Sequence, residues 1–156
     1  MKTAFKSAFV DTALFIYLLE DQPAFAESTE RFLNFCYTNQ INLVTSILTY
    51  SEFCVKPYRE HQLDLIHKYN EMIHLSGFLV STVTLLDCDQ AAKLRAKYPG
   101  LKAFDALQIA LALKEKCEIF ACNDKRLKTV NEIQVMTLDE LGKPSVTEQV
   151  EPEQAA

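Results

Sequence analysis

Short apolar runs alternate with longer amphipathic stretches along the chain, which is the pattern of strands alternating with helices. The apolar runs predict strands at 8–10, 42–46, 78–83, 118–122 and 133–136. The amphipathic stretches predict helices at 12–20, 23–37, 47–57, 61–75, 87–97 and 103–116. Ser46 is the expected cap of the third helix, and Pro57 is expected to end or bend it. This alternation predicts an α/β fold, with a mainly parallel sheet and helices on both of its faces.

Length and composition predict a single domain. The chain has 156 residues, 49% of them hydrophobic, which suffices for one core. Residues 1–141 form the expected domain, and the polar segment 142–156 is expected to be a disordered tail. No apolar run is long enough to span a membrane. The five cysteines lack the paired spacing of a zinc site, so we expect free thiols in a cytoplasmic protein.

The net charge of −5 argues against binding nucleic acid by bulk attraction. The charge is unevenly distributed, however, because residues 139–156 carry five acidic side chains against Lys143 alone. The remainder of the chain is close to neutral. A local basic surface beside an acidic site is therefore compatible with the composition.

Four acidic residues lie where strand-like runs end or in the helices that follow: Asp11, Glu52, Asp105 and Asp124. In a parallel sheet the carboxyl ends of the strands share one edge, where ligands bind. Two carboxylates about 4 Å apart repel each other by roughly 4 kcal/mol at an effective dielectric constant near 20. Such a cluster requires protons or a divalent cation, and an all-oxygen set favours Mg²⁺ or Mn²⁺.

Each of these residues also has an ordinary structural explanation. Asp11 suits a helix N-cap, Glu52 a solvated helix surface, Asp105 the first turn of a helix, and Asp124 a turn. The apolar neighbours of Asp105, among them Phe104, are a poor setting for an unpaired carboxylate. Together, the four positions favour a metal site.

Four segments resemble the PIN domain family in order and spacing. They are FVDTALFIYLLE at 9–20, SILTYSE at 46–52, FDALQIALA at 104–112 and CNDKRL at 122–127. The resemblance covers about residues 5–138. In length and single-domain build the chain is similar to the VapC-type toxins of toxin–antitoxin pairs.

The resemblance implies a magnesium-dependent endoribonuclease, the toxin of a type II toxin–antitoxin pair, that hydrolyses RNA phosphodiester bonds. Asp11, Glu52, Asp105 and Asp124 match the acidic residues that hold Mg²⁺ or Mn²⁺ in that family. We expect Asp11 and Asp105 to be direct ligands. Glu52 and Asp124 are expected to bind the metal directly or through water.

Other residues near this quartet are expected to support it through hydrogen bonds. Thr12 and Asn123 adjoin the first and last acids, and Thr49 lies one helical turn before Glu52. The chain departs from the family at Ala13, where Ser or Asn is common, and at Cys122, where Thr or Ser is common. Both departures remove a hydroxyl or amide that would support the site.

Basic side chains close to the acids are candidates for contact with RNA. Lys102 and Arg126 each lie within three residues of a proposed ligand and are the expected phosphate contacts. Lys93 and Lys97 are expected to be ordinary solvated surface.

The expected partners are an RNA substrate, a cognate antitoxin and a second copy of the chain. The apolar helices at 23–37 and 61–75 can serve either as a partner surface or as core, and we favour the core. The alternative function is an interaction protein that keeps the PIN fold without activity. The complete acidic quartet argues against that alternative.

Overall fold

The computed structural model describes residues 5–141, and the predicted tail at 142–156 lies outside these residues. Its centre is a five-stranded sheet in the order β3-β2-β1-β4-β5, and every neighbouring pair is parallel. The strands are β1 (Ser7–Val10), β2 (Asn42–Ser46), β3 (Leu79–Ser81), β4 (Ile119–Cys122) and β5 (Gln134–Thr137). The predicted parallel α/β fold is confirmed.

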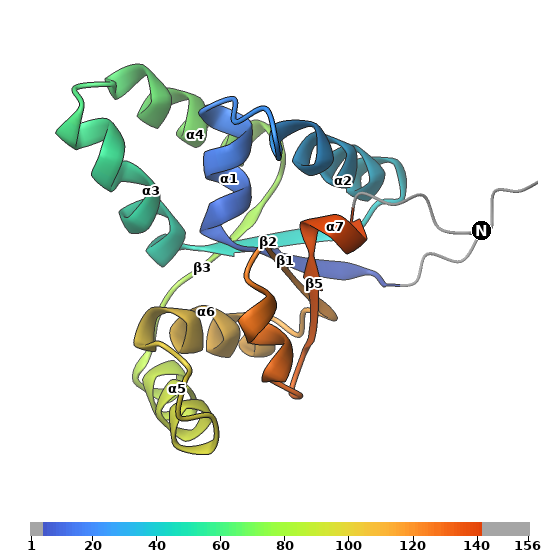
Figure 1. Cartoon of the computed structure of the whole chain (residues 1–156), viewed down its shortest axis with the longest axis vertical. Helices are drawn as coiled ribbons and strands as arrows, with labels where there is room; N and C mark the ends of the chain where they lie inside the picture. The colour runs from blue at the N-terminus through green and yellow to red at the C-terminus, as the bar shows by residue number, and fades with distance from the viewer. Residues whose placement is uncertain (1–4, 142–156) are drawn as a thin grey trace, which may run out of the picture.

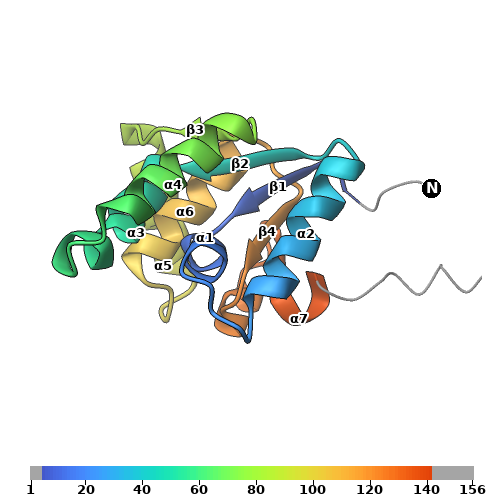
Figure 2. The same cartoon turned by 90° about the horizontal axis from the view of Figure 1, so that it is seen from above.

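Helices cover both faces of this sheet, as Figure 1 and the perpendicular view in Figure 2 show. On one face lie α1 (Thr12–Leu19), α2 (Ala26–Thr38), α3 (Ile47–Arg59), α4 (Leu63–Leu75) and the short α7 (Leu138–Leu141). On the other lie α5 (Leu85–Lys97) and α6 (Ala103–Lys114), and a 3-10 turn, η1 (Lys125–Thr129), follows β4. None of the helices within residues 5–141 combines the length and apolar character that a bilayer crossing needs.

The strands build two cores because their side chains point alternately to the two faces. Ala8 and Val10 belong to the core under α1 to α4, whereas Phe9 belongs to the core under α5 and α6. Phe9 stacks on Phe120 of the neighbouring strand, with ring centroids 5.2 Å apart. Central strands buried on both sides account for the continuous apolar runs in the sequence.

The order of the strands reverses at β1. From β1 the chain builds outward through β2 to β3, and it then crosses back to place β4 on the other side of β1. The carboxyl ends of β1, β2 and β4 consequently open onto one edge, beside Asp11, Ser46 and Asn123. Ligands bind at such a switch point in parallel α/β sheets.

Two predicted helix boundaries, on either side of the turn at residues 60–62, were wrong. The third helix does not end at Pro57 but continues to Arg59. Pro57 lies in its last turns, so the missing N–H removes one helical hydrogen bond, and the Pro57 carbonyl still accepts from Gln62 at 2.8 Å. The fourth helix starts at Leu63 rather than at residue 61, because His61 has a φ of 56° and terminates α3.

The apolar helices at 23–37 and 61–75 serve mainly as core. Phe32, Ile66 and Tyr69 are buried against the sheet, as we favoured. Phe35 and Leu63, in contrast, are 42% and 54% exposed. The cysteines are free thiols, as expected; four are buried and one, Cys88, is exposed.

Five helices end with a residue in the left-handed conformation, and only one of these residues is glycine. Gly77 follows α4 with a φ of 64°, while Asp21, Gln40, His61 and Lys116 adopt positive φ values after α1, α2, α3 and α6. For a residue with a side chain, this conformation costs roughly 1–2 kcal/mol of conformational free energy. The chain therefore carries local strain at four helix ends.

Replacing His61 by glycine should relieve this strain. We expect His61→Gly to raise the free energy of unfolding by about 0.5–1 kcal/mol, measured by urea denaturation. His67→Gly, on the exposed side of α4, is the matched control and should lower it by about 1 kcal/mol. Destabilisation by both substitutions would contradict the assignment of strain to residue 61.

Candidate active site

Asp11 is fixed at the carboxyl end of β1. Its backbone N–H donates to the Ala121 carbonyl of β4 at 3.0 Å, which continues the sheet pairing by one residue. Asp11 occupies the N-cap position of α1, but its side chain makes no capping hydrogen bond. Capping therefore does not explain the carboxylate, which remains available for another role.

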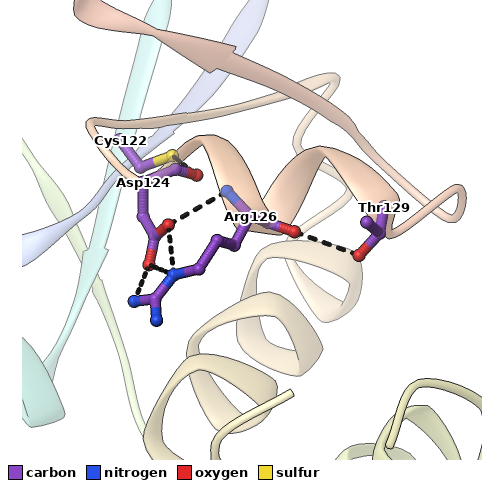
Figure 3. A network of polar contacts seen from close by, with 4 residues as sticks. All are labelled: Cys122, Asp124, Arg126 and Thr129. Carbon is purple, nitrogen blue, oxygen red and sulfur yellow. Dashed lines mark hydrogen bonds and ion pairs between the residues drawn. The ribbon is translucent and has the colours of Figure 1, made fainter. Parts of the chain in front are cut away.

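Asp124 follows β4 and is held by Arg126, as Figure 3 shows. The Arg126 guanidinium donates to both carboxylate oxygens, from Nε at 3.0 and 3.2 Å and from the terminal nitrogen at 2.7 Å. The Arg126 backbone N–H adds a fourth hydrogen bond at 3.0 Å. These bonds hold the pKa of the Asp124 carboxyl below its usual range.

The other two acids come from helices on opposite faces of the sheet. Asp105 lies in the first turn of α6 and is half-buried, whereas Glu52 lies in the second turn of α3 and is exposed. Burial and the charges of Asp124 and Glu52 raise the pKa of Asp105, against the opposing effect of Lys102 and Arg126. The three carboxylates are therefore close enough to influence one another.

Asp11 experiences the combined charge of the whole quartet. Burial, the largest effect, and the charges of Glu52, Asp105 and Asp124 together raise its pKa to about 7, against the lowering effect of the Thr12 N–H. The other three predicted acids are therefore near enough to Asp11 to act on it electrostatically. Without a cation, Asp11 is therefore partly protonated at neutral pH.

The chemistry of this site fits a divalent cation. Its donors are carboxylate oxygens, which Mg²⁺ and Mn²⁺ prefer. The hydroxyl of Thr12, directly beside Asp11, is buried without any hydrogen-bond partner. Within residues 5–141, however, no three acidic, His or Cys side chains are arranged closely enough to enclose an ion. The carboxylate of Asp124 is paired with the Arg126 guanidinium.

The predicted supporting residues lie at the site, but their hydrogen bonds go elsewhere. The Asn123 amide donates to the hydroxyl of Tyr17 at 3.0 Å. Thr49 contacts Thr45 and Gln108, not Glu52. The Cys122 thiol makes a weak 3.7 Å contact with the backbone carbonyl of Asp124, so Arg126 rather than residue 122 orients the Asp124 carboxylate.

Sequence reasoning missed a buried polar network beneath the carboxylates. Thr45, Ser46, Thr49 and Gln108 are all fully buried and hydrogen-bonded to one another. A signal was present in the sequence, because Gln108 interrupts a run of apolar residues in α6. Because glutamine is also a good helix former, its presence in α6 did not by itself indicate a buried network.

A pocket of about 390 Å³ opens beside the quartet. Asp105 and Asp124 line it together with Lys102 and Arg126, the two predicted phosphate contacts, whereas Asp11 and Glu52 lie outside its lining. The pocket combines acidic and basic groups, as a site for a metal-bound phosphate requires. Other basic residues of α5 form surface ion pairs, Lys93 with Asp89 and Lys97 with Glu132, each at 2.7 Å.

The comparison with known protein families covers the residues that form this site. The PIN domain family matches residues 8–133, which include all four acids. The chain belongs to the PIN domain family. The sequence matches no curated protein.

Solved structures share this PIN fold at low identity. VapBC2 from Rickettsia felis, bound to a DNA fragment from its promoter, is 14% identical with a TM-score of 0.69, over 84% of this chain and 98% of that chain. VapC20 from Mycobacterium tuberculosis, a toxin that cleaves the sarcin–ricin loop, is 19% identical with a TM-score of 0.63, over 81% and 98%. A toxin–antitoxin complex from Klebsiella pneumoniae is 20% identical with a TM-score of 0.62, over 84% and 97%.

The raised pKa of Asp11 predicts a pH dependence of stability in the metal-free PIN domain. An unfolded aspartate ionises near pH 3.9, whereas folded Asp11 holds its proton to about pH 7. Its contribution to stability is therefore complete below about pH 4 and is lost as the pH rises toward 7. Asp11→Asn should be more stable than the wild type at pH 7.5 but not at pH 4.

Urea denaturation at several pH values in chelator measures this difference directly. Every other titrating group is common to the two proteins, so subtracting the curves isolates Asp11. Parallel stability curves from pH 4 to 7.5 would show that the Asp11 pKa is not raised.

Proposed function

We propose that this PIN domain is a metal-dependent endoribonuclease that uses Mg²⁺ or Mn²⁺. The observation that carries the proposal is that the carboxylates of Glu52, Asp105 and Asp124 lie near the buried Asp11 at the switch point of the sheet, where burial and these three charges raise the Asp11 pKa to about 7. Such an arrangement is costly for stability alone. It is favourable for a protein that binds a divalent cation there.

In this proposal Asp11 and Asp105 are direct ligands, and Glu52 and Asp124 bind directly or through water. A bound Mg²⁺ would lower the pKa of a water molecule and neutralise charge on the scissile phosphate. The raised Asp11 pKa means that cation binding displaces a proton at neutral pH. Binding should therefore strengthen as the pH rises through 7.

Arg126 has two roles in this account. Before substrate binds, its bidentate pair with Asp124 neutralises one carboxylate of the crowded site. Arg126 and Lys102 both line the pocket, so a guanidinium freed from Asp124 could bind RNA phosphates there together with Lys102. A bound cation would supply the positive charge that Asp124 otherwise takes from Arg126.

RNA and an antitoxin are the partners that the structural relatives suggest. VapC20 cleaves an RNA loop, and the Rickettsia and Klebsiella structures contain toxin–antitoxin complexes. Looped and single-stranded RNA can enter a cleft of this kind. We therefore propose the toxin of a type II toxin–antitoxin pair. The free thiols support the cytoplasm as its compartment.

Asp105→Asn should abolish cleavage while leaving the fold intact. The substitution removes one carboxylate charge without changing side-chain shape, so we expect at least about a 100-fold loss of rate. Purified protein is incubated with a mixed RNA pool in Mg²⁺, in Mn²⁺ and in chelator, and circular dichroism verifies folding. Asp89→Asn is the matched control, because Asp89 is an exposed acid of α5 that pairs with Lys93.

Full activity in folded Asp105→Asn protein would contradict the assignment. The alternative of a silent interaction protein predicts a different result. In that case the wild type would show neither cleavage nor a rise in melting temperature with Mg²⁺.

We also propose a homodimer formed through the edge strand β3. Exposed apolar side chains surround this strand, and Leu85 and Leu86 at the start of α5 are 85% and 79% exposed. Leu79 and Val80 on the strand itself add to the surface. Unpaired edge strands with apolar surroundings favour association.

Leu86→Lys should shift the protein toward monomer, because a charge would be buried at the proposed contact. Light scattering at several concentrations measures the change in mass. Phe35→Lys is the control, because Phe35 is an exposed apolar residue of α2, which packs on the opposite face of the sheet from α5. Equal masses for Leu86→Lys and the wild type would argue against this interface.

A further inference from the structure

Gln108 is an anomaly within its helix. Its side chain is fully buried, and its neighbours along α6 from Ala106 to Ala112 are apolar. Burying an amide is costly unless all its hydrogen bonds are made, and an aliphatic side chain would fill this position without that cost. The presence of glutamine therefore calls for a role other than packing.

The hydrogen bonds of Gln108 form a chain that runs in one donor-to-acceptor order, from Ser46 through Gln108 to Thr49. Ser46 Oγ accepts from the N–H groups of Leu48 and Thr49, at 3.2 and 3.3 Å, so its own proton is free to donate to Gln108 Oε1. Gln108 Nε2 donates to Thr49 Oγ1 at 2.9 Å. The amide thus connects α6 on one face of the sheet to the start of α3 on the other.

The chain continues to the strand that carries Asp11. Thr45 donates its only hydroxyl proton to the Val10 carbonyl at 3.1 Å. The 3.1 Å contact between the Thr45 and Thr49 hydroxyls is then made with the proton of Thr49. Each hydroxyl in the network donates once, and the network ends at the residue directly before Asp11.

The positions of the carboxylates relative to this network are decisive. Asp105 lies three residues before Gln108 in α6, and Glu52 lies three residues after Thr49 in α3. Residues three apart share one face of a helix. The Gln108–Thr49 hydrogen bond therefore joins the two helical turns that adjoin Asp105 and Glu52.

We propose that Gln108 is a positioning residue whose side-chain amide, through Thr49, Ser46 and Thr45, sets the separation of Glu52, Asp105 and Asp11 for cation binding. This inference rests on the proposed metal-dependent function. Gln108 itself binds no metal or substrate. It acts by linking the three elements that carry those carboxylates.

Calorimetric titration of the full-length protein with Mn²⁺ tests this role by affinity rather than by activity. The variants are Gln108→Leu, Thr49→Val and their double mutant, with Thr49→Ser as the conservative variant that keeps the hydroxyl. Thr29→Val is the structural control, because it removes a fully buried hydroxyl of α2 that donates to the Phe25 carbonyl at 2.9 Å. Asp105→Asn reports whether the binding is at the proposed site.

We expect Gln108→Leu and Thr49→Val each to weaken Mn²⁺ binding by about 10- to 100-fold. The double mutant should lose clearly less affinity than the product of the two single losses, because both substitutions break the Gln108–Thr49 bond. Thr49→Ser and Thr29→Val should retain wild-type affinity. If Gln108→Leu does not fold, the contrast between Thr49→Val and Thr49→Ser decides the question.

Two results would overturn this inference and leave the proposed metal-dependent function standing. One is wild-type affinity in folded Thr49→Val and Gln108→Leu while Asp105→Asn loses binding. The other is a double mutant whose loss is the product of the single losses, as for two unrelated effects. Absence of Mn²⁺ binding in the wild type would remove the proposed function and the inference together.

Discussion

Mutual repulsion among four carboxylates is the constraint on which the site depends. They come from separate parts of the chain, and the reversal of strand order at β1 brings them to one edge of the sheet. Burial, together with the neighbouring carboxylates, raises the pKa of Asp11 to about 7 and also raises the pKa of Asp105. A cation at this edge would relieve the repulsion, so cation binding and stability are linked.

The fold offsets this repulsion in two ways while no cation is bound. Arg126 pairs with Asp124 and brings one guanidinium into the site. The buried network of Gln108 holds the supporting elements in register, although the carboxylates themselves repel one another. The group that balances charge is thus an exposed guanidinium, whereas the side chains of the network are fully buried. This division suits a site that exchanges an internal counter-ion for a metal and a substrate.

The sequence was sufficient for the fold because its apolar runs are buried on both sides of a parallel sheet. The acidic positions at strand ends were also readable, since a parallel sheet gathers its carboxyl ends at one edge. Contacts across the sheet were not readable. The Gln108–Thr49 bond joins residues 59 positions apart, and although Gln108 interrupts an apolar run, no local pattern identifies its partner. Likewise, a chain with three glycines gave no sign that His61 and Lys116 would adopt left-handed conformations.

Anomalous diffraction from crystals grown in Mn²⁺ would test the central claim most directly, because it locates the ion without reference to activity. The account predicts a manganese peak between Asp11 and Asp105, with Glu52 and Asp124 nearby and the Arg126 guanidinium turned away from Asp124. Saturating Mn²⁺ with no peak at this edge, and with Arg126 still paired to Asp124, would contradict it.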